Sequence, residues 1–190
     1  MRIATPIPDD LLMPAVALWW ASFGRAVRPL GGEGPLGADG RRGLVAVGQD
    51  GAVIGVAGLR DVGGGWLRLR PGLLDPLFRP APPTDDLVID GIAVAAAHRR
   101  HGVGQALVAG ALARAAQGGH PGLRAEVARR NAGAVRFWQA AGFVETGRGR
   151  FGWPWGGPVL LMRRDAVAGA AVAEGLAPGH EKTPAAWVGG

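Results

Sequence analysis

The sequence has no cysteine and no tyrosine, and it contains one serine and one lysine. Without cysteine the chain cannot form disulfides, thiolate nucleophiles or cysteine-ligated metal sites, so its folding needs no oxidising compartment. Ser22, the single serine, argues against a hydrolase with a Ser-His-Asp triad. The first residues lack the apolar run of a signal peptide, and no stretch is long enough to cross a membrane. We therefore expect a cytoplasmic protein with no membrane partner.

The chain has a single lysine, so arginine carries almost all of the positive charge behind the formal net charge of +6. A basic chain raises the question of nucleic-acid binding. No arginine-rich helix with interleaved aromatic residues and no zinc-finger spacing is present, so we expect no nucleic-acid partner. An anionic small ligand accounts for part of the charge. No metal is expected, because the histidines show no metal-binding pair; they are His98, His101, His120 and His180.

The length of 190 residues and the hydrophobic content of 48% suit one globular domain. We expect that domain over residues 1–165, followed by a weakly structured Ala/Gly/Pro-rich tail over residues 166–190. A helix should begin after Pro8, and Pro14 should limit it to its first turns or kink it. Strands are expected at 44–47, 53–59, 87–94, 123–127, 143–147 and 159–162, helices at 103–117 and 131–141, and irregular chain at 24–42 and 61–84.

The most informative stretch runs from Ile92 to Gly104. It reads as the end of an apolar strand, a short basic turn, and two glycines that open a helix. A helix N-terminus has unpaired N–H groups and partial positive charge, and glycine lets an anion approach the backbone. The pattern predicts a site for a phosphorylated ligand. A Rossmann turn at Gly102-x-Gly104, with Glu126 as the ribose acid, is a rival interpretation. The turn lies mid-chain, however, with too few residues beyond it for six strands and their helices.

Three blocks of sequence resemble the signature of a known family. They are Arg99-Arg100-His101-Gly102-Val103-Gly104, Asn131-Ala132-Gly133-Ala134 and Gly142-Phe143. In this order and at this spacing, residues 87–143 resemble the GNAT superfamily of acyl-CoA N-acyltransferases. The resemblance implies a single α/β (α+β) domain, in which a mixed β-sheet is splayed at its centre and flanked by helices.

The resemblance also implies acetyl-CoA as co-substrate and a set of residues that bind it. Backbone N–H groups from about Arg100 to Gln105 would hold the pyrophosphate. The pantetheine arm would pair with the backbone of one strand, in the gap between strands 87–95 and 122–128, and Asn131 would lie near the thioester. The implied cofactor-binding residues are Ile92, Ala93, Val94, Arg99, Arg100, His101, Gly102, Val103, Gly104, Gln105 and Asn131.

Acyl transfer to an amine requires a group that takes the amine proton, and a carboxylate can do so directly or through water. Glu126 and Asp90 lie on the two strands that the resemblance places beside the gap, and some members of the family carry a catalytic Glu near the position of Glu126. Each carboxylate could instead serve in an ion pair, Glu126 with Arg124 or Arg129, and Asp90 with an arginine of the preceding loop. Both residues remain candidates for the base.

The family's usual general acid, a tyrosine, is replaced by Trp138, seven residues after Asn131. An indole N–H donates a hydrogen bond but supplies no proton, so Trp138 could also be core packing. We expect an acetyl-CoA-dependent N-acetyltransferase in which a primary amine attacks the thioester directly, with its carbonyl polarised by a backbone N–H near Val94. The alternative is a non-catalytic acyl-CoA-binding or sensing module. The acceptor is a small-molecule or peptide amine, and a homodimer is compatible with the chain.

Overall fold

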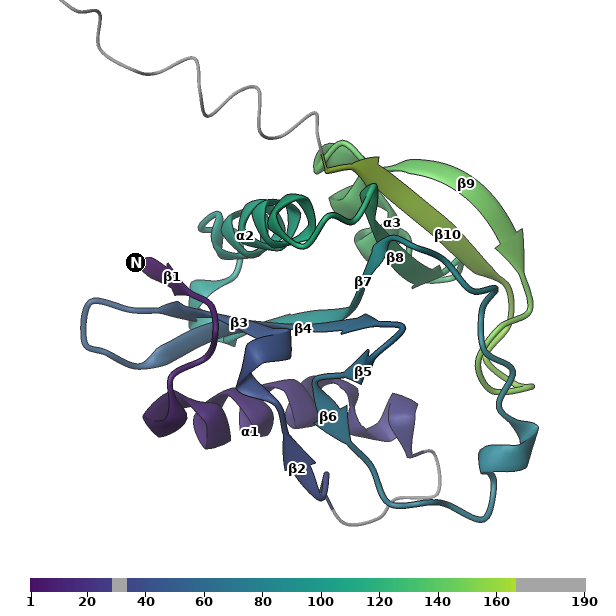
Figure 1. Cartoon of the computed structure of the whole chain (residues 1–190), viewed down its shortest axis with the longest axis horizontal. Coiled ribbons are helices and arrows are strands. Elements are labelled where there is room, and N and C mark those ends of the chain that lie inside the picture. Colours follow the sequence, from purple (N-terminus) through teal and green to yellow (C-terminus); the bar gives the residue numbers. More distant parts are fainter. Residues whose placement is uncertain (29–33, 167–190) are drawn as a thin grey trace, which may run out of the picture.

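The computed structural model describes residues 1–28 and 34–166, and the predicted tail lies outside this range apart from Ala166. A mixed sheet in the order β1-β3-β4-β7-β8-β10-β9 forms the framework, and β5 pairs with β4 (Figure 1). Only the β7–β8 pair is parallel among the described strands. The strands are β1 (Arg2–Ala4), β3 (Gly43–Val47), β4 (Val53–Asp61), β5 (Gly64–Gly65), β7 (Leu87–Val94), β8 (Gly122–Ala128), β9 (Val144–Gly149) and β10 (Val159–Asp165).

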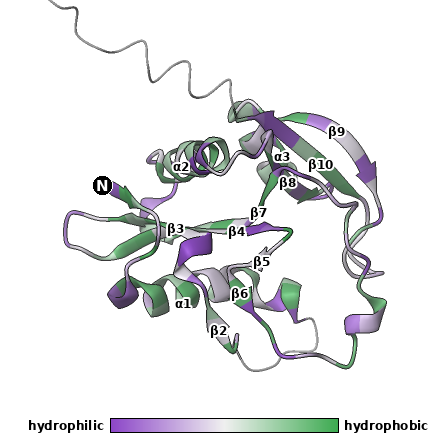
Figure 2. Ribbon diagram, viewed as in Figure 1, coloured by the Kyte–Doolittle hydropathy of each residue, from purple (hydrophilic) through white to green (hydrophobic). Residues whose placement is uncertain are grey.

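Helices cover both faces of this sheet. Helix α1 (Asp9–Val27) lies against one face, and α2 (Val103–Gln117) lies against the other (Figure 1). The third helix, α3 (Ala132–Ala140), packs beside β8. Figure 2 shows the hydrophobic stretches along the central strands that these helices cover. The smaller elements are β2 (Gly37–Ala38) paired with β6 (Leu67–Arg68), and the 3₁₀ turns η1 (Gly40–Arg42), η2 (Asp75–Leu77) and η3 (Ala96–His98).

Two apolar clusters form the core, one on each face of the sheet. Leu87, Ile89, Leu123 and Ala125 point toward α2. Successive strand residues face opposite sides, so Val88, Arg124 and Glu126 belong to the α1 face. The expected strands at 44–47, 53–59 and 87–94 and the expected helix at 103–117 are confirmed. None of the helices in the described ranges is both long enough and apolar enough to cross a bilayer.

The expectation that Pro14 limits the first helix to its first turns is wrong, because α1 continues through Pro14 to Val27. Proline removes one backbone donor and disturbs the preceding turn, and this costs a lone helix several kcal/mol, about 3 by host–guest measurements. Burial of Val16 and Trp19 in the core beneath α1 offsets that cost. Tertiary packing thus extends the helix into part of the segment expected to be loop.

A β-bulge interrupts β7 at Gly91. Gly58 of β4 pairs with Gly91, and Leu59 pairs with Ile89, so Asp90 is the extra residue. Gly91 has φ +153°, and a Cβ atom built on it would lie 2.9 Å from Cε2 of Phe23. Glycine is therefore required here for both conformation and space. The bulge sets the position of the Asp90 carboxyl group.

The parallel pair β7–β8 is short. Its register covers Leu87–Leu123, Val88–Arg124 and Ile89–Ala125 only, although β7 continues to Val94 and β8 to Ala128. Beyond Ile89 and Ala125 the two strands separate, and we call this divergence the splay. The expected central splay of the sheet is present, and it begins at Asp90 and Glu126.

Candidate functional site

A run of unpaired backbone donors lies between β7 and α2. Backbone hydrogen bonding along this turn stops at Arg99, whose N–H donates to Ala96, and resumes at Ala106, whose N–H donates to Gly102 at 3.0 Å. Within residues 1–28 and 34–166, the N–H groups from Arg100 to Gln105 have no acceptor. Six consecutive free donors at a helix N-terminus are an arrangement that suits an anion, and we call residues 100–105 the anion-binding turn.

Backbone conformation keeps these donors exposed. Arg100 has φ +63° and is the one non-glycine residue with positive φ among those described, and Gly102 follows at +77°. A left-handed arginine carries strain of about 1 kcal/mol, of the kind that marks functional turns. The Arg99 Nε atom donates to the Val94 carbonyl at 3.2 Å, and the His101 Nδ1 atom lies 2.8 Å from the Arg99 carbonyl. These contacts hold the Arg99 side chain against the end of β7 and the His101 ring against the turn.

Gly102 and Gly104 serve different purposes in this turn. Nothing lies within 4 Å of a Cβ atom built on Gly102, so its open side is free for a ligand. A Cβ on Gly104 would lie 3.0 Å from Cε2 of Phe137 on α3. A side chain at position 104 would therefore require the Phe137 ring to shift.

Ile92 and Val94 offer their backbone groups to the splay. Ala95 N–H donates to Ile54 of β4, and N–H directions alternate along a strand. The groups of Val94 and Ile92 therefore point away from β4, toward the side where β8 has separated. Ala93, aligned with Val56, faces β4. Of the three residues expected to pair with an extended ligand, two are oriented to do so.

Asn131 caps α3, because its Oδ1 atom accepts a hydrogen bond from the Ala134 N–H at 3.0 Å. The helix expected at 131–141 is present, and it follows the end of β8, on the other side of the splay. The same side chain is the one that the family resemblance places near a thioester.

Replacing Asn131 with alanine should lower the free energy of unfolding by about 1 kcal/mol, because the first turn of α3 loses its cap. Urea denaturation of Asn131→Ala beside Asn131→Asp provides the measurement. The aspartate variant retains an acceptor and should stay close to the parent protein. Equal losses in both variants would contradict a capping role.

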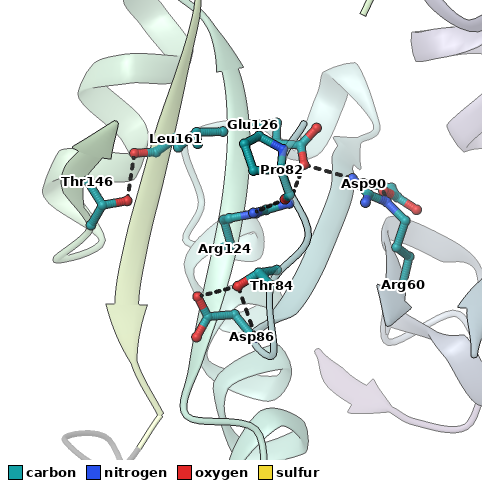
Figure 3. Close-up of polar contacts among 9 residues, drawn as sticks. All are labelled: Arg60, Pro82, Thr84, Asp86, Asp90, Arg124, Glu126, Thr146 and Leu161. Carbon is teal, nitrogen blue, oxygen red and sulfur yellow. Dashed lines mark hydrogen bonds and ion pairs between the residues drawn. The ribbon is translucent and has the colours of Figure 1, made fainter. Parts of the chain in front are cut away.

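The two candidate carboxylates lie at the point where the strands separate. Asp90 and Glu126 are the first residues of β7 and β8 beyond the last aligned pair. Arg60 of β4 joins them: its Nε donates to Asp90 Oδ1 at 2.6 Å, and its Nη2 donates to Glu126 Oε1 at 3.0 Å (Figure 3). The sequence therefore places both carboxylates correctly, and the structure brings them together through one guanidinium group.

Arg124 completes this cluster. Its Nη2 donates to Glu126 Oε1 at 2.9 Å, and its Nη1 donates to the Pro82 carbonyl at 2.8 Å (Figure 3). The pairing of Glu126 with Arg124 is one of the two alternatives weighed from the sequence. Asp90, by contrast, pairs with Arg60 and not with the loop that precedes β7. Two carboxylates and two guanidinium groups leave the cluster neutral overall.

The electrostatic surroundings distinguish Asp90. Burial raises the pKa of the Asp90 carboxyl above its usual value, and the negative charge of Glu126 adds to the rise, although Arg60 opposes it. The pKa of Arg60 is itself raised, since the attraction of Asp90 and Glu126 outweighs its own burial. A carboxylate with a raised pKa is a better proton acceptor near neutral pH.

Sequence reasoning missed Arg60, because the expected strand stopped at Leu59. The structure continues β4 to Asp61, and the extra residues place Arg60 opposite Val88, next to the bulge. Arg60 could have been found by extending the strand expected at 53–59 by one residue. The sequence does not favour that extension, since an arginine after an apolar run is equally typical of a loop.

Several cavities lie near this region. One of about 190 Å³ adjoins the cluster and is lined by Arg60, Val88 and Arg124 together with part of the segment 81–86. A second of about 270 Å³ is lined by Leu59, Arg60 and Leu87 with the C-terminal end of α2, and a third of about 660 Å³ lies between the start of α1, η1 and β5–β6. Neither Asp90 nor Glu126 lines any of these three cavities. The cavity of about 190 Å³ is lined by both Arg60 and Arg124, the arginines that hold the two carboxylates.

Trp138 is 6% exposed and belongs to the core. Its ring makes edge contacts with Phe137 and Phe143, whose centroids lie at 5.2 and 4.7 Å. These contacts support the interpretation of Trp138 as packing. Across the two described ranges, no group of three or more metal-ligating side chains gathers.

Comparison with known proteins gives one family and a set of similar folds. The model of the acetyltransferase (GNAT) family matches residues 14–143. No curated protein matches the chain. A GCN5-related N-acetyltransferase from Kribbella flavida is 24% identical, with TM-score 0.57 over 86% of this chain and 96% of that one. Ard1 from Thermoplasma volcanium is 18% identical, with TM-score 0.58 over 86% and 96%. Both likenesses concern the fold. The chain also spans 64% of a nourseothricin acetyltransferase at 27% identity, with TM-score 0.47 over 65% of its own length.

Proposed function

The chain belongs to the acetyltransferase (GNAT) family, and from this premise we propose that it transfers an acetyl group from acetyl-CoA to a primary amine. One observation carries the proposal: six unpaired N–H groups lie beside a splay whose base holds two carboxylates. The turn binds an anionic group, and the splay takes an extended arm. The carboxylates face the reacting amine.

The reaction proceeds by direct attack within a ternary complex. Acetyl-CoA supplies the activated acyl group. As the C–N bond forms and the C–S bond breaks, the amine proton passes to Asp90 or Glu126, directly or through water. The backbone N–H of Val94, which points into the splay, polarises the thioester carbonyl. Solvent protonates the departing thiolate, whose pKa is close to that of free cysteine, about 8.5.

An acceptor screen tests this function. Purified protein is incubated with acetyl-CoA and a panel of small-molecule and peptide amines, and free thiol is measured. We expect thiol release that depends on one class of amine, with the acetylated product confirmed by mass. Tight acetyl-CoA binding by calorimetry without turnover of any amine would favour the alternative, an acyl-CoA-binding module.

Replacing Trp138 with phenylalanine should keep kcat within about tenfold, because the indole has no proton to transfer at neutral pH. The loss should appear in stability, since a smaller ring leaves a void beside Phe143. Steady-state kinetics and thermal unfolding of Trp138→Phe separate the two effects. A thousandfold fall in kcat with unchanged acetyl-CoA affinity would show that Trp138 organises the chemistry.

A further inference from the structure

We propose that Arg60 is a positioning residue for acetyl transfer: it fixes Asp90 and Glu126 across the base of the splay, with one oxygen of each turned toward the acceptor. The inference rests on the proposed function and adds a residue to it. Arg60 comes from β4, a strand that carries none of the residues expected to bind the donor or take the proton.

The geometry of the contacts supports this role. The Arg60 side chain uses Nε for Asp90 Oδ1 and Nη2 for Glu126 Oε1, so one rigid plane sets both carboxylates (Figure 3). A guanidinium group offers donors at fixed angles, whereas a lysine ammonium is a single point of charge. The spacing between the two acids therefore depends on the shape of Arg60 as well as on its charge.

Each carboxylate keeps a second oxygen available. Among the residues that the structure describes, nothing donates to Asp90 Oδ2 or Glu126 Oε2, while the other oxygen of each acid is held by arginine. The Asp90 and Glu126 side chains retain 24% and 23% exposure. A free oxygen within reach of solvent is what an acid–base group needs in order to contact an amine or a bridging water.

Charge is the second contribution of Arg60. The charged groups that face Asp90 are Arg60 on β4 and Glu126 on β8, with Arg124 behind Glu126. The α1 side chains over the bulge, Trp19 and Phe23, are uncharged. Arg60 lowers the proton affinity of Asp90, and Glu126 raises it. Removing Arg60 should therefore raise the pKa of Asp90 further and move the acidic limb of kcat/KM to higher pH.

Two substitutions separate shape from charge. In Arg60→Gln, the acidic limb should move up by about one pH unit and kcat/KM at pH 7 should fall about tenfold or more, because one neighbouring countercharge is lost. In Arg60→Lys, the limb should stay near its original position while kcat still falls. Arg148→Gln, which breaks an exposed ion pair with Glu145, is the matched control and should change neither. Calorimetry should show acetyl-CoA affinity within about twofold of the parent, since Arg60 lies outside the anion-binding turn.

The outcomes also distinguish this inference from the proposed function. The acidic limb of the kcat/KM profile could disappear in Asp90→Asn or Glu126→Gln but keep its position in Arg60→Gln. That result would refute the positioning role of Arg60 and support the carboxylate as the base. If the limb persists when both acids are replaced, the assignment of the base fails first. Should Arg60→Gln not fold, Arg60→Lys decides: a kcat and pH profile equal to those of the parent would overturn the positioning role.

Discussion

Replacing Gln105 with glutamate should weaken acetyl-CoA binding about thirtyfold while leaving the fold intact. Gln105 is exposed, and its N–H is the last of the six free donors. Glutamate has the same shape and adds one negative charge beside the proposed pyrophosphate position. At about 5 Å in a water-like dielectric, repulsion from two phosphate charges amounts to about 2 kcal/mol, which corresponds to that change in Kd.

The fold itself should gain slightly from the same substitution. Acidic residues in the first turn of a helix interact favourably with its dipole. Thermal unfolding of Gln105→Glu should therefore occur at or above the parent temperature, which excludes misfolding as the cause of weaker binding. Calorimetry at two salt concentrations provides the second check, because the loss of affinity should shrink as salt screens the charges.

Gln117→Glu is the matched control, since it makes the identical change at the other end of the same helix. Its acetyl-CoA affinity should equal that of the parent, because the anion-binding turn lies at the N-terminus. Equal losses in the two variants would mean that net charge, and not the turn, governs binding. A Gln105→Glu protein with undiminished affinity would contradict the site. The substitution Gly104→Val is less informative, since the added side chain would also collide with Phe137.

The elements that the sequence predicts well are those in which local and tertiary signals agree. Helix α2 runs from Val103 to Gln117 as expected, because its apolar face repeats at helical spacing and glycines flank both ends. Helix α3 lies within the expected range 131–141, where an asparagine cap begins it and Gly142, with φ +81°, follows its end. In α1 the proline at position 14 disfavours a helix, whereas burial of the following apolar residues favours one, and the helix forms.

In the site, too, some residues could be predicted from the sequence and others depend on tertiary contacts. Asp90 and Glu126 were found from the sequence because each lies on one of the two strands that the family resemblance places beside the gap. Their partner Arg60 is 30 residues from Asp90 and 66 from Glu126, and it contacts them only once the sheet has formed. A bulge of one residue then determines which way Asp90 points. No pattern within a single strand encodes such a contact, so the link between the two acids had to come from the structure.

Replacement of the two carboxylates should have the largest effect on catalysis. If one acid accepts the amine proton, its amide variant should lose about 100-fold to 1000-fold in kcat/KM, the usual contribution of general-base catalysis. Acetyl-CoA affinity should be retained, because neither Asp90 nor Glu126 belongs to the anion-binding turn. Asp90→Asn, Glu126→Gln and the double variant form the series, measured by thiol release between about pH 5 and 9.

The direction of the pH effect follows from the pKa of Asp90, which is raised by its burial and by Glu126. A base acts only when ionised, so kcat/KM should fall as pH drops through that raised pKa. The acceptor amine also titrates, and two acceptors of different basicity separate the effects: the limb that moves with the acceptor belongs to the amine, and the limb that stays belongs to the protein. Because Asp90 has the raised pKa, Asp90→Asn should abolish the fixed limb, and Glu126→Gln should shift it to lower pH by removing a negative neighbour. A fixed limb that survives in the double variant would show that solvent takes the proton.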